Sequence, residues 1–266
     1  MISAPDGAPR YDEASIGGVL DFVAVGDVML DVRLPAPRPG TRLHTRVGAG
    51  AGGSAVKAAC AAARLGARAA VVGAVGDDAT GRAIAEELAR LGVEALFSVI
   101  QARTGTTVYA GDAVVADRGA NERAVFEELP EARVTLVSAY LPDPVLTVGL
   151  AHGLRAVDLQ GVLADAPGAD VVLGPDLDLD TLAPRHRVVC ATLAEAGAEA
   201  VAAGHRARVR PRRVLAESPI GAGDAFAAGF LLALADGLAL EECLRRGGAS
   251  VEDAHAERQK RDARGE

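Results

Sequence analysis

SPIGAGDAFAAGF, residues 218–230, is the stretch that says most about the fold of this 266-residue chain. Its Gly-Ala-Gly triplet, residues 221–223, leads into an apolar run that predicts a helix from Ala222 to Asp236. The first N–H groups of a helix have no acceptor inside it, so together they form an anion site. Asp224 falls in this first turn, where a carboxylate repels a bound phosphate. The acid therefore either complements the helix dipole or takes a proton from a substrate hydroxyl.

Apolar runs and helical patterns alternate outward from this segment along most of the chain. Strands are predicted within residues 22–27, 67–76, 133–141, 154–160, 169–174 and 187–193. Helices are predicted at 53–65, up to Leu91, near 144–153, at 222–236 and from Ala239 to about Glu252, with a hairpin across 199–215. This alternation predicts an α/β fold of three layers, with a doubly wound, mostly parallel sheet covered by helices.

Two extended stretches interrupt the alternation, at about 32–47 and 95–118. Because no helix pattern lies within them, they predict a small β lid on the main sheet. The segment rich in Pro, Gly and acids, residues 1–20, predicts a flexible tail, and 256–266 a charged C-terminal tail. Residues 21–255 are left as one domain.

Composition narrows the classes of function. The net charge is −8, and three Tyr, five Phe and no Trp leave few rings for base stacking, which argues against nucleic-acid binding. The most apolar stretch, Ala225–Ala235, is about half of what a membrane span needs. Three widely spaced cysteines fit neither a disulfide framework nor a zinc site, and no secretory pattern begins the chain. We therefore expect a cytoplasmic protein.

The segment GAGDAFAAGF, residues 221–230, resembles the C-terminal signature of the PfkB/ribokinase family of carbohydrate and nucleoside kinases. Residues 48–93 resemble the family's other signature in register, and VAVGDVMLDV, residues 23–32, resembles its first strand. The resemblance covers roughly residues 22–252. It implies a ribokinase-like fold with a β lid and ATP-dependent phosphorylation of a hydroxyl on a small sugar or sugar acid. A nucleoside kinase and a catalytically weakened ligand-binding sensor are the alternatives.

The same resemblance assigns candidate site residues. It implies that Asp224 is the catalytic base and that Gly221, Ala222 and Gly223 form the anion hole. It places Asp31 on the substrate hydroxyls, which suits a carboxylate, and the Gly52-Gly53 pair against the sugar. Thr192 and Gly197 resemble the nucleotide loop.

Departures from the family pattern bear on the cofactors, which are expected to be ATP and Mg²⁺. Where the family usually has Asp-Thr before GAGD, this chain has Ser218-Pro219, which makes activation by a monovalent cation doubtful. The family's N-x-x-E element aligns best with residues 175–178, so Asp178 is the candidate magnesium residue although the Asn is gone. Ala194 replaces a glycine of the nucleotide loop.

Two basic residues bear on the substrate. Lys57 stands where many sugar kinases carry Asn, and it either reads an anionic group on the substrate or faces solvent or satisfies Asp27 or Asp31. Arg118 offers a second positive contact, or lies at the surface. The five histidines make no ligand spacing and are expected at the surface. A homodimer through the β lid is also expected, because the lid forms the dimer interface in several members of the family.

Overall fold

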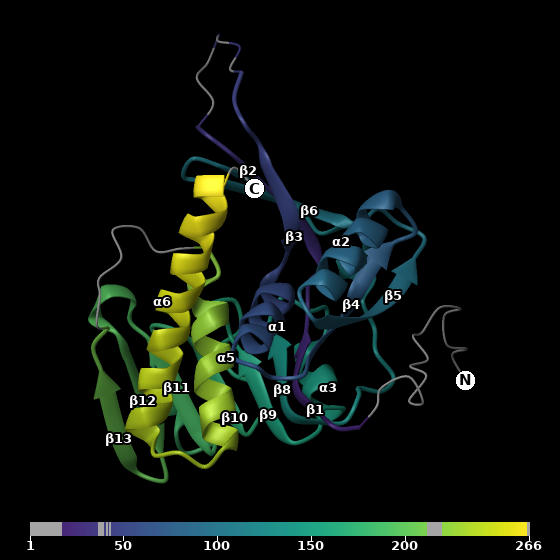
Figure 1. The fold of residues 1–266 in the computed structure, drawn as a ribbon. Helices are drawn as coiled ribbons and strands as arrows, with labels where there is room; N and C mark the ends of the chain where they lie inside the picture. Colours follow the sequence, from purple (N-terminus) through teal and green to yellow (C-terminus); the bar gives the residue numbers. More distant parts are fainter. Residues whose placement is uncertain (1–17, 37–39, 41, 43, 212–219, 265–266) are drawn as a thin grey trace.

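The computed structural model describes residues 18–36, 40, 42, 44–211 and 220–264. Its main body is a large sheet with strand order β13-β12-β11-β10-β9-β8-β1-β4-β5 (Figure 1). Neighbouring strands are parallel from β11 to β5, and β12 and β13 are added antiparallel at one edge. The strands are β1 (Leu20–Val25), β4 (Ala69–Gly76), β5 (Val93–Ile100), β8 (Ala132–Ser138), β9 (Leu154–Asp158), β10 (Val171–Pro175), β11 (Val188–Thr192), β12 (Ala198–Ala202) and β13 (His205–Val209).

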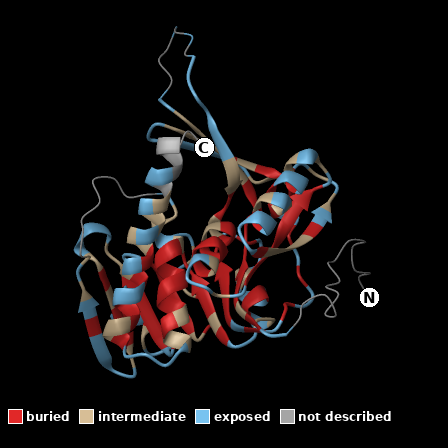
Figure 2. Cartoon of the chain, in the orientation of Figure 1, coloured by how far each residue is buried: buried red, intermediate tan, exposed pale blue. Residues whose placement is uncertain are grey.

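Helices and loops bury both faces of this sheet, as the buried central strands in Figure 2 show. One face packs against α1 (Ser54–Arg64), α2 (Ala79–Arg90), α5 (Ala222–Ala235) and α6 (Leu240–Arg264). The other packs against α3 (Pro144–Gly149), α4 (Leu179–Leu182), the 3-10 helix η1 (Gly119–Arg123) and loops. The predicted three-layer α/β fold is therefore confirmed.

A second sheet, of order β3-β2-β6-β7, projects beyond the carboxyl ends of the main strands (Figure 1). Its strands are β2 (Met29–Leu34), β3 (Gly48–Gly52), β6 (Gly105–Ala110) and β7 (Ala113–Asp117). Only residues 26–28 separate β1 in the main sheet from β2 in the second one. The same segment therefore carries the chain from the core to the rim of the site.

The predicted lid boundaries need correction. Residues 95–100 belong to β5, which pairs in parallel with β4 over its whole length, so the second sheet takes up the chain only at Gly105. Of the extended stretch expected at about 32–47, residues 32–34 belong to β2, the other described residues form no strand, and β3 begins at Gly48. Hydrophobic pattern alone does not distinguish an edge strand of one sheet from a strand of another.

The C-terminal region also differs from prediction, because α6 continues to Arg264 rather than ending near Glu252. The sequence 253–264 contains neither Gly nor Pro, so nothing in it stops a helix. Residues 256–264 are therefore charged, as expected, but helical. The tail predicted at 1–20 lies mostly outside the described residues, and its last residue begins β1.

One histidine is not at the surface. The ring of His186 is buried, with Nδ1 3.0 Å from the Ala169 carbonyl and Nε2 2.6 Å from Asp165 Oδ1. It ties the loop between β9 and β10 to the start of β11. In the described part of the chain, no helix is both long and apolar enough to cross a lipid bilayer.

Candidate active site

The N-terminus of α5 is the centre of the candidate site. Gly221 caps this helix with φ +88°, a left-handed conformation that favours glycine, and its carbonyl accepts the first helical bond from Ala225 N at 2.9 Å. The helix begins at Ala222, so the N–H groups of its first turn are free of intrahelical acceptors. Residues 221–223 therefore have the geometry of an anion site.

Asp224 lies in that first turn, half-buried at the edge of the anion site. Burial raises the pKa of its carboxyl to about 8. The positive charge of Lys57 opposes this shift, whereas the negative charges of Asp158 and Asp31 add to it. A carboxyl with this pKa changes its protonation state close to neutral pH instead of near pH 4, which is a property that suits a general base.

Asp31 is fully buried on β2, and the neighbouring Gly52-Gly53 pair leaves room for it and for the Asp27 carbonyl. A methyl group at Gly52 would lie 2.1 Å from Asp31 Cγ, and one at Gly53 would lie 2.0 Å from the Asp27 carbonyl oxygen. Gly53 also has φ +94°. The glycine pair is therefore required by the protein's own packing. One carboxylate oxygen, Asp31 Oδ1, is buried and finds no hydrogen-bond partner among the residues that the structure describes.

Lys57, near the start of α1, is held against this carboxylate. Its Nζ lies 2.9 Å from Asp31 Oδ2 and 3.2 Å from the Tyr109 hydroxyl, and its side chain is 18% exposed. Burial alone lowers the pKa of Lys57, but the charges of Asp31 and Asp224 raise it above the usual value. Of the alternatives that the sequence left open, the structure shows Lys57 satisfying Asp31. Arg33, which the sequence did not single out, contacts the same oxygen at 3.3 Å.

Arg118 is paired in a similar way. Its guanidinium donates two hydrogen bonds to Asp27, at 3.0 and 2.8 Å, and one to the Tyr140 carbonyl. The hydrogen bond to Asp27 raises the pKa of Arg118 further above its ordinary range. Arg118 thereby joins the end of β7 to the segment between β1 and β2.

Asn121 reinforces this junction, although nothing in the sequence had marked it. Its fully buried amide accepts from Val28 N at 2.9 Å and donates to the Val28 and Arg118 carbonyls at 3.0 and 2.9 Å. Strand β2, which carries Asp31, begins at Met29, the residue after Val28. A buried amide in a single 3-10 turn gives no periodic signal, so only the fold reveals it.

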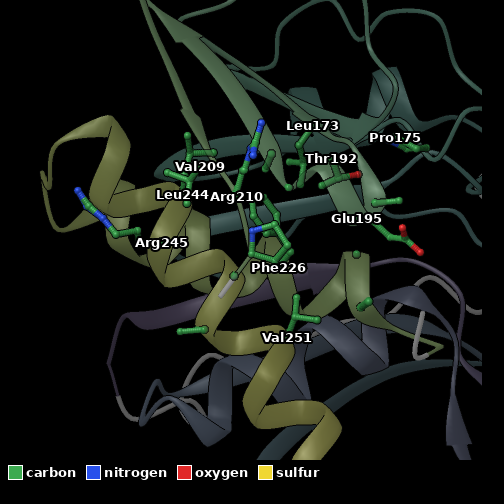
Figure 3. Close-up of a pocket in the computed structure, with 18 of the residues that line it drawn as sticks. Leu173, Pro175, Thr192, Glu195, Val209, Arg210, Phe226, Leu244, Arg245 and Val251 are labelled. Atoms are coloured by element: carbon green, nitrogen blue, oxygen red, sulfur yellow. The ribbon is translucent and has the colours of Figure 1, made fainter. Parts of the chain in front are cut away.

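A cavity of about 520 Å³ opens beside the N-terminus of α5 (Figure 3). Its apolar wall comes from strands β10 and β13 and from helices α5 and α6, through Leu173, Val209, Phe226, Leu244 and Val251. Ala222 and Gly223 line it where the helix begins. An apolar slot that ends at an anion site matches a ligand with a flat ring at one end and phosphates at the other.

Thr192 and Gly197, predicted for nucleotide binding, both line this cavity. Gly197 has φ +96°, and a methyl group there would lie 2.0 Å from the Val209 carbonyl oxygen, so its first role is to let β12 and β13 approach. Ala194, in the turn between Thr192 and Gly197, adopts φ +47°. This is the position where the family's glycine is missing.

Asp158 is the site residue that sequence reasoning missed. It ends β9, lines the cavity and is 5% exposed, and burial raises the pKa of its carboxyl to about 7. Gln160 donates to it from its backbone N at 3.2 Å and from its side-chain amide. An acid at the carboxyl end of a parallel strand was the available signal, because ligands of open α/β sheets bind at that edge.

Asp178 lies apart from the residues above. It caps α4, is exposed, and accepts from Thr181 N at 3.2 Å and from the Thr181 hydroxyl at 2.6 Å. These hydrogen bonds hold the pKa of its carboxyl below the usual value. Among the described residues, no three His, Cys, Asp or Glu side chains gather as a metal cluster. Ser218-Pro219, the departure that concerns a monovalent cation, lies outside the described residues.

A three-layer α/β fold with a β lid, together with an acid in the first turn of a helix whose N-terminus has the geometry of an anion site, defines the ribokinase-like class of small-molecule kinases. The chain belongs to the pfkB family of carbohydrate kinases, whose sequence profile matches residues 20–170 and 178–251. The resemblance found in the signatures is thereby confirmed. No curated protein matches the sequence at a significant level.

Solved structures support the same fold. Ribokinase from Thermotoga maritima superposes with a TM-score of 0.76 at 20% identity, covering 87% of this chain and 91% of that one. Adenosine kinase from Sinorhizobium meliloti gives 0.75 at 22% identity, covering 88% and 93%. Ribokinase from Arabidopsis thaliana, complexed with ribose and ATP, gives 0.70 at 21% identity, covering 88% and 92%. At these identities the similarity establishes the fold.

Proposed function

We propose that the protein transfers the terminal phosphoryl group of ATP to a hydroxyl of a small sugar or sugar acid. Kinases of the pfkB family are ATP-dependent phosphotransferases, which sets the reaction class. The observation that carries the proposal is Asp224, a carboxyl with its pKa raised to about 8 at the start of a helix that opens onto the cavity. A base there lies next to the site for the transferring group.

In this proposal Asp224 accepts the proton of the acceptor hydroxyl as the oxygen attacks the terminal phosphorus of ATP. The bond from that phosphorus to the bridging oxygen breaks, and ADP leaves. The free amides at residues 221–223 stabilise the charge on the transferring group. Positioning and electrostatics supply most of the catalysis in such transfers.

The acceptor is proposed to lie between Asp224 and the second sheet. The unpartnered Oδ1 of Asp31 would accept a hydrogen bond from a sugar hydroxyl, since a buried carboxylate oxygen gains most from a donor. The backbone at Gly52 and Gly53 would form the floor. Lys57 and Arg118 remain substrate candidates at the rim, with their charges already balanced by Asp31 and Asp27.

ATP is proposed to occupy the cavity of about 520 Å³, with its base against the apolar wall and its phosphates toward Gly223. Thr192 and Gly197 would border the nucleotide. Asp178 remains the candidate magnesium residue: its exposed carboxylate suits a hydrated ion, which binds proteins through few carboxylates and keeps several waters, although it is not among the residues that line the cavity. Magnesium, when bound, neutralises phosphate charge during the transfer.

Two other functions stay open for specific reasons. A nucleoside acceptor is favoured by structural neighbours that include an adenosine kinase and an archaeal nucleoside kinase. A catalytically weakened ligand-binding protein is favoured by Ala194. This residue has a positive φ and stands where the nucleotide loop of the family has a glycine.

The lid is also proposed to form a homodimer. Val114 and Val115 on its outer strand β7 are 59% and 67% exposed. A second copy that covered them would remove this apolar surface from water, which favours association. A cytoplasmic location remains our proposal; it is supported by the buried Cys190 and Cys243, which form no disulfide in the described part of the chain.

ADP release from ATP and Mg²⁺ tests the function. Neutral sugars, acid sugars, sugar phosphates and nucleosides are offered in turn to wild type and to Asp224→Asn. Turnover on one group, reduced by at least about a hundredfold in the variant, is the expected result. Asp236→Asn, at the other end of the same helix, is the matched control and should keep wild-type turnover. A folded wild-type protein that binds ATP but releases no acceptor-dependent ADP would instead favour the sensor.

A further inference from the structure

Lys57 occupies a position from which it acts on two carboxylates at once. Its aliphatic stem packs on the start of α5: a methyl group at Gly221 would lie 3.1 Å from Lys57 Cδ and 3.7 Å from Asp224 Oδ2. The stem and the Asp224 carboxylate therefore flank the same glycine. The ammonium group, at the other end, is fixed on Asp31.

Its contacts leave the ammonium little freedom to move. It is held by Asp31 at 2.9 Å and by the Tyr109 hydroxyl at 3.2 Å, and it lies 5.6 Å from the centre of the Tyr109 ring. The side chain is 18% exposed. A cation fixed in this way keeps a constant field on its neighbours, and the field is strong because little water screens it.

The surroundings of Asp224 make that field consequential. Among the described residues, the charged and titratable groups facing it are Lys57 from α1, Asp31 from β2, Asp158 from β9 and the Tyr140 hydroxyl after β8. Tyr109 of β6 faces Lys57 and Tyr140. In this set only Lys57 favours the ionised carboxylate, whereas both acids and burial oppose it.

We propose that Lys57 is a positioning residue for catalysis: anchored on Asp31, it favours the ionised form of Asp224, the form that accepts the hydroxyl proton. This inference rests on the proposed role of Asp224 as the base. It gives Lys57 a role in the reaction itself, whether or not it also contacts the substrate. The anchor also makes the base depend on the carboxylate proposed to bind the acceptor.

Titration of Asp224 in the ligand-free protein tests the inference without a known substrate. Aspartate carboxyl carbons are labelled with ¹³C, and the Asp224 signal is assigned with Asp224→Asn. Lys57→Met should move the Asp224 midpoint upward by about one pH unit, the lower end of the effect of a nearby opposite charge. Lys57→Arg should leave it nearly in place, and Asp158→Asn should move it downward. Lys57→Gln can still hydrogen-bond to Asp31 but carries no charge, so it should shift the Asp224 midpoint as Lys57→Met does. It takes the place of Lys57→Met if that variant does not fold.

Kinetics supply the second readout once an acceptor is known. Loss of kcat/KM in Lys57→Met should be about tenfold at pH 7 and should largely disappear above pH 9, because one pKa unit changes the ionised fraction tenfold. A titration midpoint that stays at the wild-type value, or an equal loss at every pH, would overturn the inference. Activity that survives in Asp224→Asn would instead overturn the proposed function, so the two failures are distinguishable.

Discussion

Glycines 52 and 223 both border the candidate site, but they have opposite surroundings. A side chain at Gly52 would overlap the Asp31 carboxylate at 2.1 Å, whereas one at Gly223 would meet no atom of the described residues within 4 Å. Gly223 nevertheless lines the cavity at the helix start. The space beside Gly223 is thus available to a ligand, whereas the space beside Gly52 is filled by the protein itself.

Gly223→Ala should therefore separate binding from stability. Thermal denaturation should show an unchanged or higher melting temperature, because Ala in a helix is favoured over Gly by about 1 kcal/mol. Calorimetric titration with a non-hydrolysable ATP analogue should show affinity reduced roughly tenfold or more, since small displacements at a phosphate site are costly.

Gly52→Ala is the matched comparison and should lose stability itself, because Asp31 or the backbone must move. Wild-type affinity for the analogue in Gly223→Ala would remove this glycine from the anion hole.

Individual residues were predictable where a short motif fixes the chemistry. Asp224 and the Gly52-Gly53 pair stand in such motifs, and the structure places them at one site. Asp158 and Asn121 were missed because each acts through contacts with segments distant in sequence, and a single Asp or Asn after a strand has many other uses. Lys57 was found, but its partner among the acids became clear only from the distances.

At the scale of an element, the turn before β12 is strained. Ala194 has φ +47°, a conformation that costs a residue with a side chain about 1 kcal/mol or more. Here the chain lacks the glycine that the family's nucleotide loop usually supplies.

Ala194→Gly should raise the free energy of unfolding by about 1 kcal/mol, measured by urea denaturation. Ala196→Gly, an exposed position two residues on with no positive φ, is the control and should lower it by about 0.5–1 kcal/mol. Destabilisation by both substitutions would show that the turn does not hold strain.

The elements themselves were largely predictable from alternating patterns and glycine ends, as α1 and β4 illustrate. Assignment to a sheet was not, because β5 and the lid strand β6 follow one another as extended segments with no helix pattern between them, and only their pairing partners show which sheet each belongs to. The end of α6 was missed because a charged segment gives no apolar stripe, although nothing in it breaks a helix.

At the scale of the whole molecule, the burial of two acids, Asp158 and Asp224, lowers the free energy of unfolding when they are ionised. The pKa of Asp158 is raised to about 7 and that of Asp224 to about 8, against 3.8 for an ordinary Asp. Between pH 4 and 8 the folded protein therefore binds more protons at these groups than the unfolded chain does. By linkage, their contribution to stability falls as the pH rises through this window.

Asp158→Asn should therefore stabilise the protein at pH 8 by up to about 4 kcal/mol, at roughly 1.4 kcal/mol per pKa unit, and by much less at pH 4. The difference in unfolding free energy between wild type and variant is the quantity to measure, because carboxyls with lowered pKa values contribute equally to both proteins. A gain that does not depend on pH would show that Asp158 is not held protonated.

The glycine pair at the start of α1 has a consequence for how relatives of this protein change over evolutionary time. Because Gly52 and Gly53 leave room for Asp31 and the Asp27 carbonyl, selection for folding alone preserves them. A descendant that had lost phosphoryl transfer would still inherit both, but would be free to replace Gly223. Retention of the pair in a lineage therefore records the architecture, and retention of Gly223 beside Asp224 records the chemistry.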